Sequence, residues 1–171
     1  MSLLVWLENT FAWVLEADSL FAYPMILTFH TFGLALLVGI SVAVSLRILG
    51  VASKLPLAPL ESFFPIMLAG FWFNVVTGFL LFAPEATRWA FNVDFLLKMF
   101  CVFLGMYVIH LIRKTVFRDP SSLTSGGPTR RAKVLAATSI AVWVAAITLG
   151  RLSAYVDGWT KFKSLFDVAG S

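Results

Sequence analysis

The chain has 171 residues, of which 60% are hydrophobic and 13% charged, with a mean hydropathy of +0.90 and a net charge of +4. Disordered chains are charge-rich and poor in aromatic residues, so the 17 Phe and 6 Trp exclude disorder. A soluble domain of this size carries roughly twice this share of charges and has too little interior to bury so much apolar surface, which indicates a membrane protein.

Four apolar segments are each long enough to cross a bilayer, which takes about 20 residues in an α-helix. We expect these spans at about residues 21–46, 62–84, 94–114 and 133–156. Each must be helical because lipid offers no partner for backbone N–H and C=O groups. The predicted fold is therefore all-α, an integral membrane four-helix bundle that forms one domain over residues 1–171.

The two ends of the chain predict short interfacial helices. Residues 1–17 place Trp6, Phe11 and Trp13 among polar groups, and the tail that follows Gly158 is similar in character. Such segments lie in the plane of the membrane interface. Anchoring by aromatic side chains is a sufficient role for both.

The distribution of charge predicts the orientation. The connections at residues 47–61 and 113–133 hold eight basic and two acidic residues, whereas the opposite side holds five basic and seven acidic residues. Because basic loops stay in the cytoplasm, we expect both termini to be periplasmic in a bacterial inner membrane. Residues 115–131 form the cytoplasmic linker, and the basic residues indicate orientation rather than a nucleic-acid partner.

Small residues recur at four-residue spacing in three of the spans, which suits the close approach of helices in lipid. The stripes are Thr31, Ala35, Gly39 and Ala43 in the first span, Gly70, Asn74 and Gly78 in the second, and Ala146, Gly150 and Ala154 in the fourth. They predict either a compact bundle or contacts with another membrane subunit or a second copy.

Each span sends a polar or ionisable residue into one slab of the outer leaflet. The helical rise places His30 roughly 6 Å and Lys98 and Arg151 roughly 10 Å to the periplasmic side of the midplane, and Asn74 and Thr77 fall near the level of His30. Charged groups in hydrocarbon face the bundle interior or water. The alternative for Lys98 and Arg151 is that they extend outward to lipid headgroups.

His30 is the strongest candidate because imidazole binds iron and zinc, donates to quinone carbonyls and shuttles protons. Gly33, one turn on, would leave room for a flat group. The alternative is a histidine that is hydrogen-bonded to Asn74 or to a backbone carbonyl. His110 lies within a turn of Arg113, where an interfacial role is the simpler interpretation, and its depth argues against a haem shared with His30.

Two stretches resemble a family of small bacterial four-span membrane proteins of unknown function, itself distantly similar to copper-resistance D and b-type cytochrome membrane domains. They run from Tyr23-Pro24 through His30-Thr-Phe-Gly33 to Leu46-Arg47, and from Thr77-Gly78 through Phe91-Asn92 to Lys98. The resemblance covers roughly residues 21–100. It implies that His30, Asn92 and Lys98 occupy recurring positions, whereas Ser45 stands where an acidic residue is expected.

These observations favour a membrane redox component that holds haem b or a quinone. The predicted cofactor-binding residues are His30, Gly33, Asn74, Lys98 and Arg151, with His30 as the metal ligand if iron is bound, and no catalytic residue is predicted. The alternative is a non-catalytic membrane subunit of a larger complex. A metal-ion permease is less well supported, because little beyond His110 and Ser41 would continue a polar path to the cytoplasm.

Overall fold

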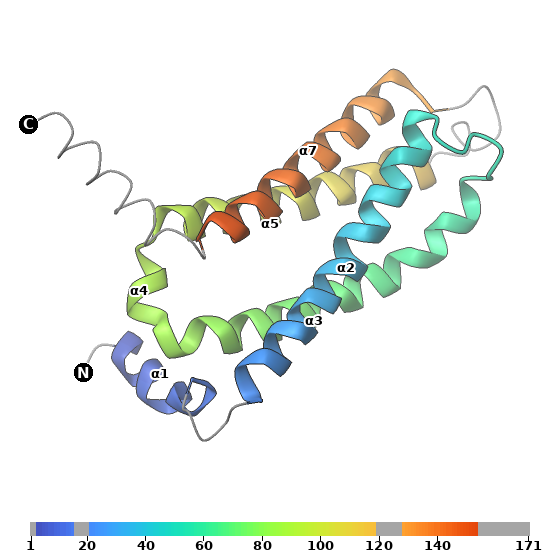
Figure 1. The fold of residues 1–171 in the computed structure, drawn as a ribbon. Helices are drawn as coiled ribbons and strands as arrows, with labels where there is room; N and C mark the ends of the chain where they lie inside the picture. The colour runs from blue at the N-terminus through green and yellow to red at the C-terminus, as the bar shows by residue number, and fades with distance from the viewer. Residues whose placement is uncertain (1–2, 16–20, 119–127, 154–171) are drawn as a thin grey trace, which may run out of the picture.

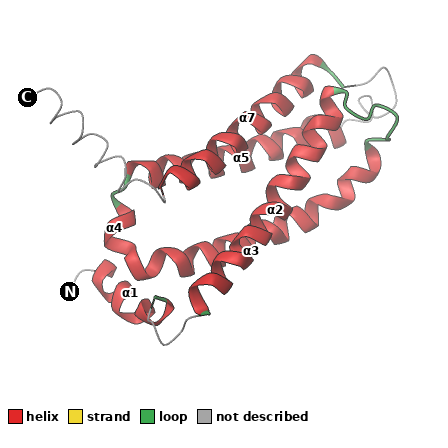
Figure 2. Cartoon of the chain, viewed as in Figure 1, coloured by secondary structure: helices red, strands yellow, loops and turns green. Residues whose placement is uncertain are grey.

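The computed structural model describes residues 3–15, 21–118 and 128–153, and every element in them is helical (Figure 2). The long helices are α2 (Ala22–Leu49), α3 (Phe64–Phe82), α5 (Val93–Ile112) and α7 (Arg130–Ser153). This confirms the predicted all-α class. Four helices are long and apolar enough to cross a membrane, which is the pattern of a multi-pass membrane protein. The predicted C-terminal interfacial helix lies outside the described residues.

Short elements join and extend these helices. They are α1 (Leu3–Phe11), η1 (Ala12–Val14), η3 (Ala58–Phe63), η4 (Ala83–Glu85), α4 (Ala86–Ala90) and the π-helical turn η5 (Arg113–Phe117). Two long helices extend farther than predicted. α2 continues three residues beyond 46, and α7 begins three residues before 133.

Local sequence explains where two of the helices begin and end. Gly50 follows α2 with φ of 108°, a left-handed conformation that glycine adopts without steric cost. The backbone N–H groups of Gly50 and Val51 donate to the last carbonyls of α2. At the start of α5, the side-chain oxygen of Asn92 accepts from the backbone N–H of Phe95 at 3.1 Å, as an N-cap does. Asn92 therefore has a structural role at the position that the family resemblance singled out.

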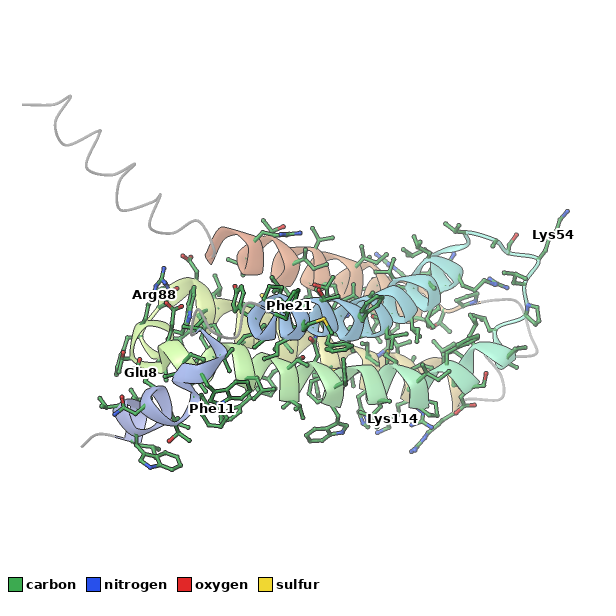
Figure 3. The ribbon with its side chains drawn as sticks, turned by 60° about the horizontal axis from the view of Figure 1, so that its bottom comes forward. Glu8, Phe11, Phe21, Lys54, Arg88 and Lys114 are labelled. Atoms are coloured by element: carbon green, nitrogen blue, oxygen red, sulfur yellow. The ribbon has the colours of Figure 1, made fainter. Side chains whose placement is uncertain are left out.

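The bundle consists of two helix pairs, α2 with α3 and α5 with α7, which meet where α2 contacts α7 (Figure 1). The pairs diverge toward α4 and α1. We call this the α4 end, and the opposite end, where α2 terminates and α7 begins, the basic end. In Figure 3, Glu8 and Arg88 mark the α4 end, whereas Lys54 and Lys114 lie toward the basic end.

Tight packing is concentrated between the middle of the bundle and the basic end. Ile48, Val116 and Trp143 are fully buried there. A hydrogen bond of 3.1 Å between the hydroxyls of Ser41 and Ser139 joins α2 to α7 within this core. Interhelical hydrogen bonds of this kind supplement packing where lipid supplies no hydrophobic driving force between helices.

Helices α2 and α3 cross at two glycines. A Cβ added at Gly70 would lie 2.9 Å from Leu36 Cβ and 3.2 Å from the carbonyl oxygen of Gly33. A Cβ added at Gly33 would lie 3.2 Å from the carbonyl oxygen of Gly70. The two backbones are therefore in direct contact, and neither position has room for a side chain.

The first predicted stripe of small residues does not form this crossing. Thr31, Ala35, Gly39 and Ala43 are all exposed, and no other atom of the described residues lies within 4 Å of a Cβ placed on Gly39. Residues on the other face of α2, including Gly33 and Leu37, form the interior. Contact with another subunit or a second copy remains the prediction for this stripe.

The N-terminal segment docks against the α4 end. Glu8 of α1 accepts hydrogen bonds from the backbone N–H and the hydroxyl of Thr87, which satisfies an open donor in the first turn of α4. Phe11 packs edge-on against Phe79 of α3, with ring centroids 5.6 Å apart. The bonds from Thr87 lower the pKa of the Glu8 carboxyl. The exposed rings of Trp6 and Trp13 fit the predicted interfacial position of this segment.

Candidate functional site

His30 lies on the inner face of α2, one turn before Gly33 and two turns before Leu37, both of which are buried. Its Nδ1 is 3.0 Å from the hydroxyl oxygen of Thr77 on α3. The backbone carbonyl of Asn74 also faces the imidazole. The side chain is half-buried between the two helices rather than directed away from the bundle.

The hydroxyl of Thr77 identifies the proton-bearing nitrogen of His30. Thr77 Oγ1 is 2.9 Å from the carbonyl oxygen of Phe73, to which it donates its single proton. A hydroxyl that donates to Phe73 accepts from His30, and on that basis we assign the N–H of the neutral ring to Nδ1. The lone pair lies on Nε2, which leaves that nitrogen available as an acceptor or a ligand.

Gly78 provides the space in which the imidazole lies. A Cβ at this position would come within 3.1 Å of His30 Cε1 and 3.6 Å of Nδ1. A side chain at residue 78 would require the ring to shift. Gly78 is therefore a positioning residue for His30, a role that its place in a small-residue stripe did not reveal.

Lys98 reaches the same region from the opposite helix pair. Its side chain is half-buried and extends along α7, where a Cβ at Gly150 would lie 3.5 Å from Lys98 Cε and 3.7 Å from Nζ. Among the described residues, Lys98 makes its side-chain contacts with α7 rather than with His30. It lies on the same face of α5 as the buried Gly105, two turns away. The structure places this side chain against α7, half-buried.

Asn74, one turn before Thr77 on α3, has a side-chain acceptor without a hydrogen-bond partner in the described part of the chain. Its side-chain oxygen is buried and has no hydrogen-bond partner among the described residues. A buried polar group without a partner costs about 1–3 kcal/mol. The backbone nitrogen of Asn74 is on the side of α3 that contacts α2 at Gly33.

Of the other two predicted site residues, Gly33 adjoins this group, since a Cβ there would lie 3.3 Å from the backbone nitrogen of Asn74. Gly33 is in contact with α3, whose Phe73 ring and backbone occupy the space expected for a flat ligand. Arg151 is exposed near the end of α7. The crossing of α2 and α3 explains why residue 33 is a glycine. The exposure of Arg151 fits the alternative in which this cation extends outward from the helix end.

The aromatic residues at position 29 of α2 and positions 71–73 of α3 mostly face outward. Phe29 and Phe73 pack edge-on at 6.1 Å, yet both remain more than 40% exposed, and Trp72 is 60% exposed. Phe71 is the exception, because it packs against the buried core. These rings therefore do not form a box around the imidazole.

In the described part of the chain, no three His, Cys, Asp or Glu side chains cluster as they do around a metal ion. A metal at His30 would therefore need ligands that this group does not supply, such as porphyrin nitrogens. His110 is exposed near the basic end of α5 and lies apart from His30. Ser45, at the position of the expected acid, is fully buried, and its hydroxyl has no partner among the described residues.

No protein-family model matches the sequence, and the searches of curated proteins and of solved structures found no match either. The interpretation of the site therefore rests on the residues themselves. We call the group formed by His30, Asn74, Thr77 and Lys98 the His30 site.

Proposed function

We propose that this protein is a membrane redox component that holds a quinone or a haem b at the His30 site. We further propose that it is a multi-pass protein of the bacterial inner membrane. The basic loops would then lie in the cytoplasm, with the α4 end on the periplasmic side. The observation that carries the redox proposal is a half-buried imidazole whose Nδ1 is 3.0 Å from the hydroxyl of Thr77, which is itself bonded to the carbonyl of Phe73.

The arrangement resembles the way proteins prepare a ligating or proton-transferring histidine. Such a ring commonly donates its second N–H to an oxygen, which fixes its tautomer and orientation. Here Thr77 fills that role, and Thr77 is itself fixed through the carbonyl of Phe73.

Each residue would have a distinct part in binding. Nε2 of His30 would accept a hydrogen bond from a quinol hydroxyl or ligate haem iron. Lys98 would donate to the other polar group of a quinone or pair with a haem propionate. The buried oxygen of Asn74 offers a further acceptor. The bound group supplies the electron transfer, while this chain binds it, orients it and holds one exchangeable proton.

The test is the cofactor content of the full chain purified in mild detergent. Absorbance spectra before and after dithionite would detect haem, and solvent extraction would quantify quinone per mole of protein. We expect the wild type to carry one of the two and His30→Ala to lose it. His110→Ala replaces the other histidine of the chain and should retain it. The proposal is wrong if the wild type contains neither, or if His30→Ala retains the full amount.

A second candidate, a non-catalytic membrane subunit, is favoured by the exposed stripe of Thr31, Ala35, Gly39 and Ala43. Small residues allow a helix of another protein or of a second copy to approach closely. Gly39→Leu should then reduce the size of the purified assembly, while His30→Ala leaves it unchanged. An unchanged assembly in Gly39→Leu would remove this candidate.

A further inference from the structure

A hollow of about 60 Å³ lies at the basic end, away from the His30 site. Only basic or potentially basic residues line it, and we call it the basic hollow: His110, Arg113, Lys114 and Arg118. We infer that the basic hollow binds a phosphate group, either of an anionic phospholipid or of a soluble phosphate compound.

The backbone places these side chains around one point. After Ile112, α5 continues as the π-helical turn η5, in which the N–H of Arg118 donates to the carbonyl of Arg113 at 3.2 Å. This wider turn keeps Arg118 close to Arg113 instead of rotating it farther around the helix. Single π-turns are uncommon and occur frequently at functional sites.

Buried apolar residues fix this turn in place. Val116 is fully buried and Phe117 is 6% exposed. Phe117 packs edge-on against Phe64 of α3, with ring centroids 5.2 Å apart. The basic groups are thus carried by a well-packed backbone, as expected of a formed binding site rather than of a loose cationic loop.

One lining residue is also oriented by its neighbours. The guanidinium of Arg113 lies over the ring of Phe64, 5.5 Å from its centroid, and 3.7 Å from the carboxylate of Glu61. Guanidinium groups bind phosphate oxygens in pairs, and lysine supplies a compact point charge. The Glu61 carboxylate offsets part of the charge of Arg113 but none of the lining residues is acidic.

The position of the hollow matches the place where phosphate occurs at a membrane. It lies where α5, one of the four candidate spans, reaches its end, at the end of the bundle where α7 begins with the exposed Arg130 and Arg131. Basic pockets at this level bind the headgroups of anionic lipids. A general positive surface attracts such lipids diffusely, whereas the hollow predicts one bound phosphate that depends on its lining residues.

The test compares two variants of the full chain that each lose two positive charges at the basic end. Lys114→Gln/Arg118→Gln removes charges from the hollow, and Arg130→Gln/Arg131→Gln removes the same number from the start of α7. All four side chains are exposed, so both variants should fold, and thermal unfolding would verify this. Binding is measured by native mass spectrometry with phosphatidylglycerol, with phosphatidylcholine as the uncharged control, and with inorganic phosphate.

We expect one molecule of phosphatidylglycerol or of phosphate to bind the wild type. The hollow variant should lose at least about tenfold in affinity, or about 1.4 kcal/mol, and the α7 variant about twofold or less. Binding of the lipid alone identifies a headgroup as the source, whereas binding of inorganic phosphate identifies a soluble compound. Equal losses in the two variants would overturn the proposal in favour of diffuse attraction, and so would the absence of binding by both ligands.

Discussion

The contact between Gly33 and Gly70 predicts that one methyl group separates α2 from α3. In Gly70→Ala the new Cβ would lie 2.9 Å from Leu36 Cβ, 3.2 Å from the carbonyl oxygen of Gly33 and 3.3 Å from the backbone nitrogen of Leu37. Two of these neighbours are backbone atoms, so the helices themselves must move. Overpacking of this kind costs about 1–3 kcal/mol.

Gly39→Ala is the matched control for this prediction. It introduces the same methyl group into the same kind of helix, but nothing in the described residues lies within 4 Å of the new atom. Alanine stabilises a helix interior by about 1 kcal/mol relative to glycine. Both variants gain this helix propensity, so the difference in stability between Gly70→Ala and Gly39→Ala measures the cost of the clash at the helix crossing.

The assay is thermal unfolding of the two variants and the wild type in one detergent, followed by circular dichroism. At about 2–4 °C per kcal/mol for a chain of this size, Gly70→Ala should unfold roughly 2–12 °C below Gly39→Ala. Equal unfolding temperatures would show that α2 and α3 do not cross at Gly33 and Gly70. The placement of His30 against Thr77 would then lose its support.

Three further predictions test other parts of the structure. Thr77→Val keeps the shape of the side chain but leaves the Nδ1 proton of His30 without its hydroxyl acceptor. The cofactor content of the purified protein should fall, because binding is weakened by about 1 kcal/mol, and an unchanged cofactor content would contradict the role of Thr77. Gly105→Ala places a methyl group 3.0 Å from the buried indole of Trp143, and should lower stability by about 1–3 kcal/mol in the same unfolding assay, whereas a stable variant would refute this packing. The lowered pKa of Glu8 means that α1 docking is favoured above the ordinary carboxyl pKa of 4.5 and lost as pH falls through the lowered value. The protection of α1 amides from hydrogen exchange, relative to the intrinsic rate at each pH, should therefore fall on acidification in the wild type, and Glu8→Gln should remove that change in protection.

The sequence predicts the helices because long apolar runs in lipid have few alternatives to helix. Their ends are less predictable, since Gly50 and the π-turn after Ile112 depend on local geometry rather than on hydropathy. The inner face of α2 could not be chosen from sequence. Both faces are apolar, and stripes that contain Gly33 or Gly39 are equally plausible until α3 is placed.

For the candidate site, the sequence predicts the level of a residue along its helix, but not whether its side chain points into the bundle or outward. The helical rise correctly placed Thr77 near the level of His30, and the observed hydrogen bond joins them. The same rule placed Arg151 close to the level of Lys98, yet Arg151 is exposed while Lys98 is half-buried. Long side chains near helix ends can extend either way, so only packing against Gly150 decides the direction for Lys98.

The central claim is that His30 carries its proton on Nδ1 and presents Nε2 to a redox ligand. The chain has only two histidines, so NMR of protein labelled at the histidine ring nitrogens resolves His30 with His110 as the internal reference. We predict that His30 is in the Nδ1–H form and that its Nε2 resonance shifts when a quinone or haem is added, while His110 does not respond. A proton on Nε2 of the neutral ring, or an Nε2 resonance that is unmoved by both ligands, would contradict the account.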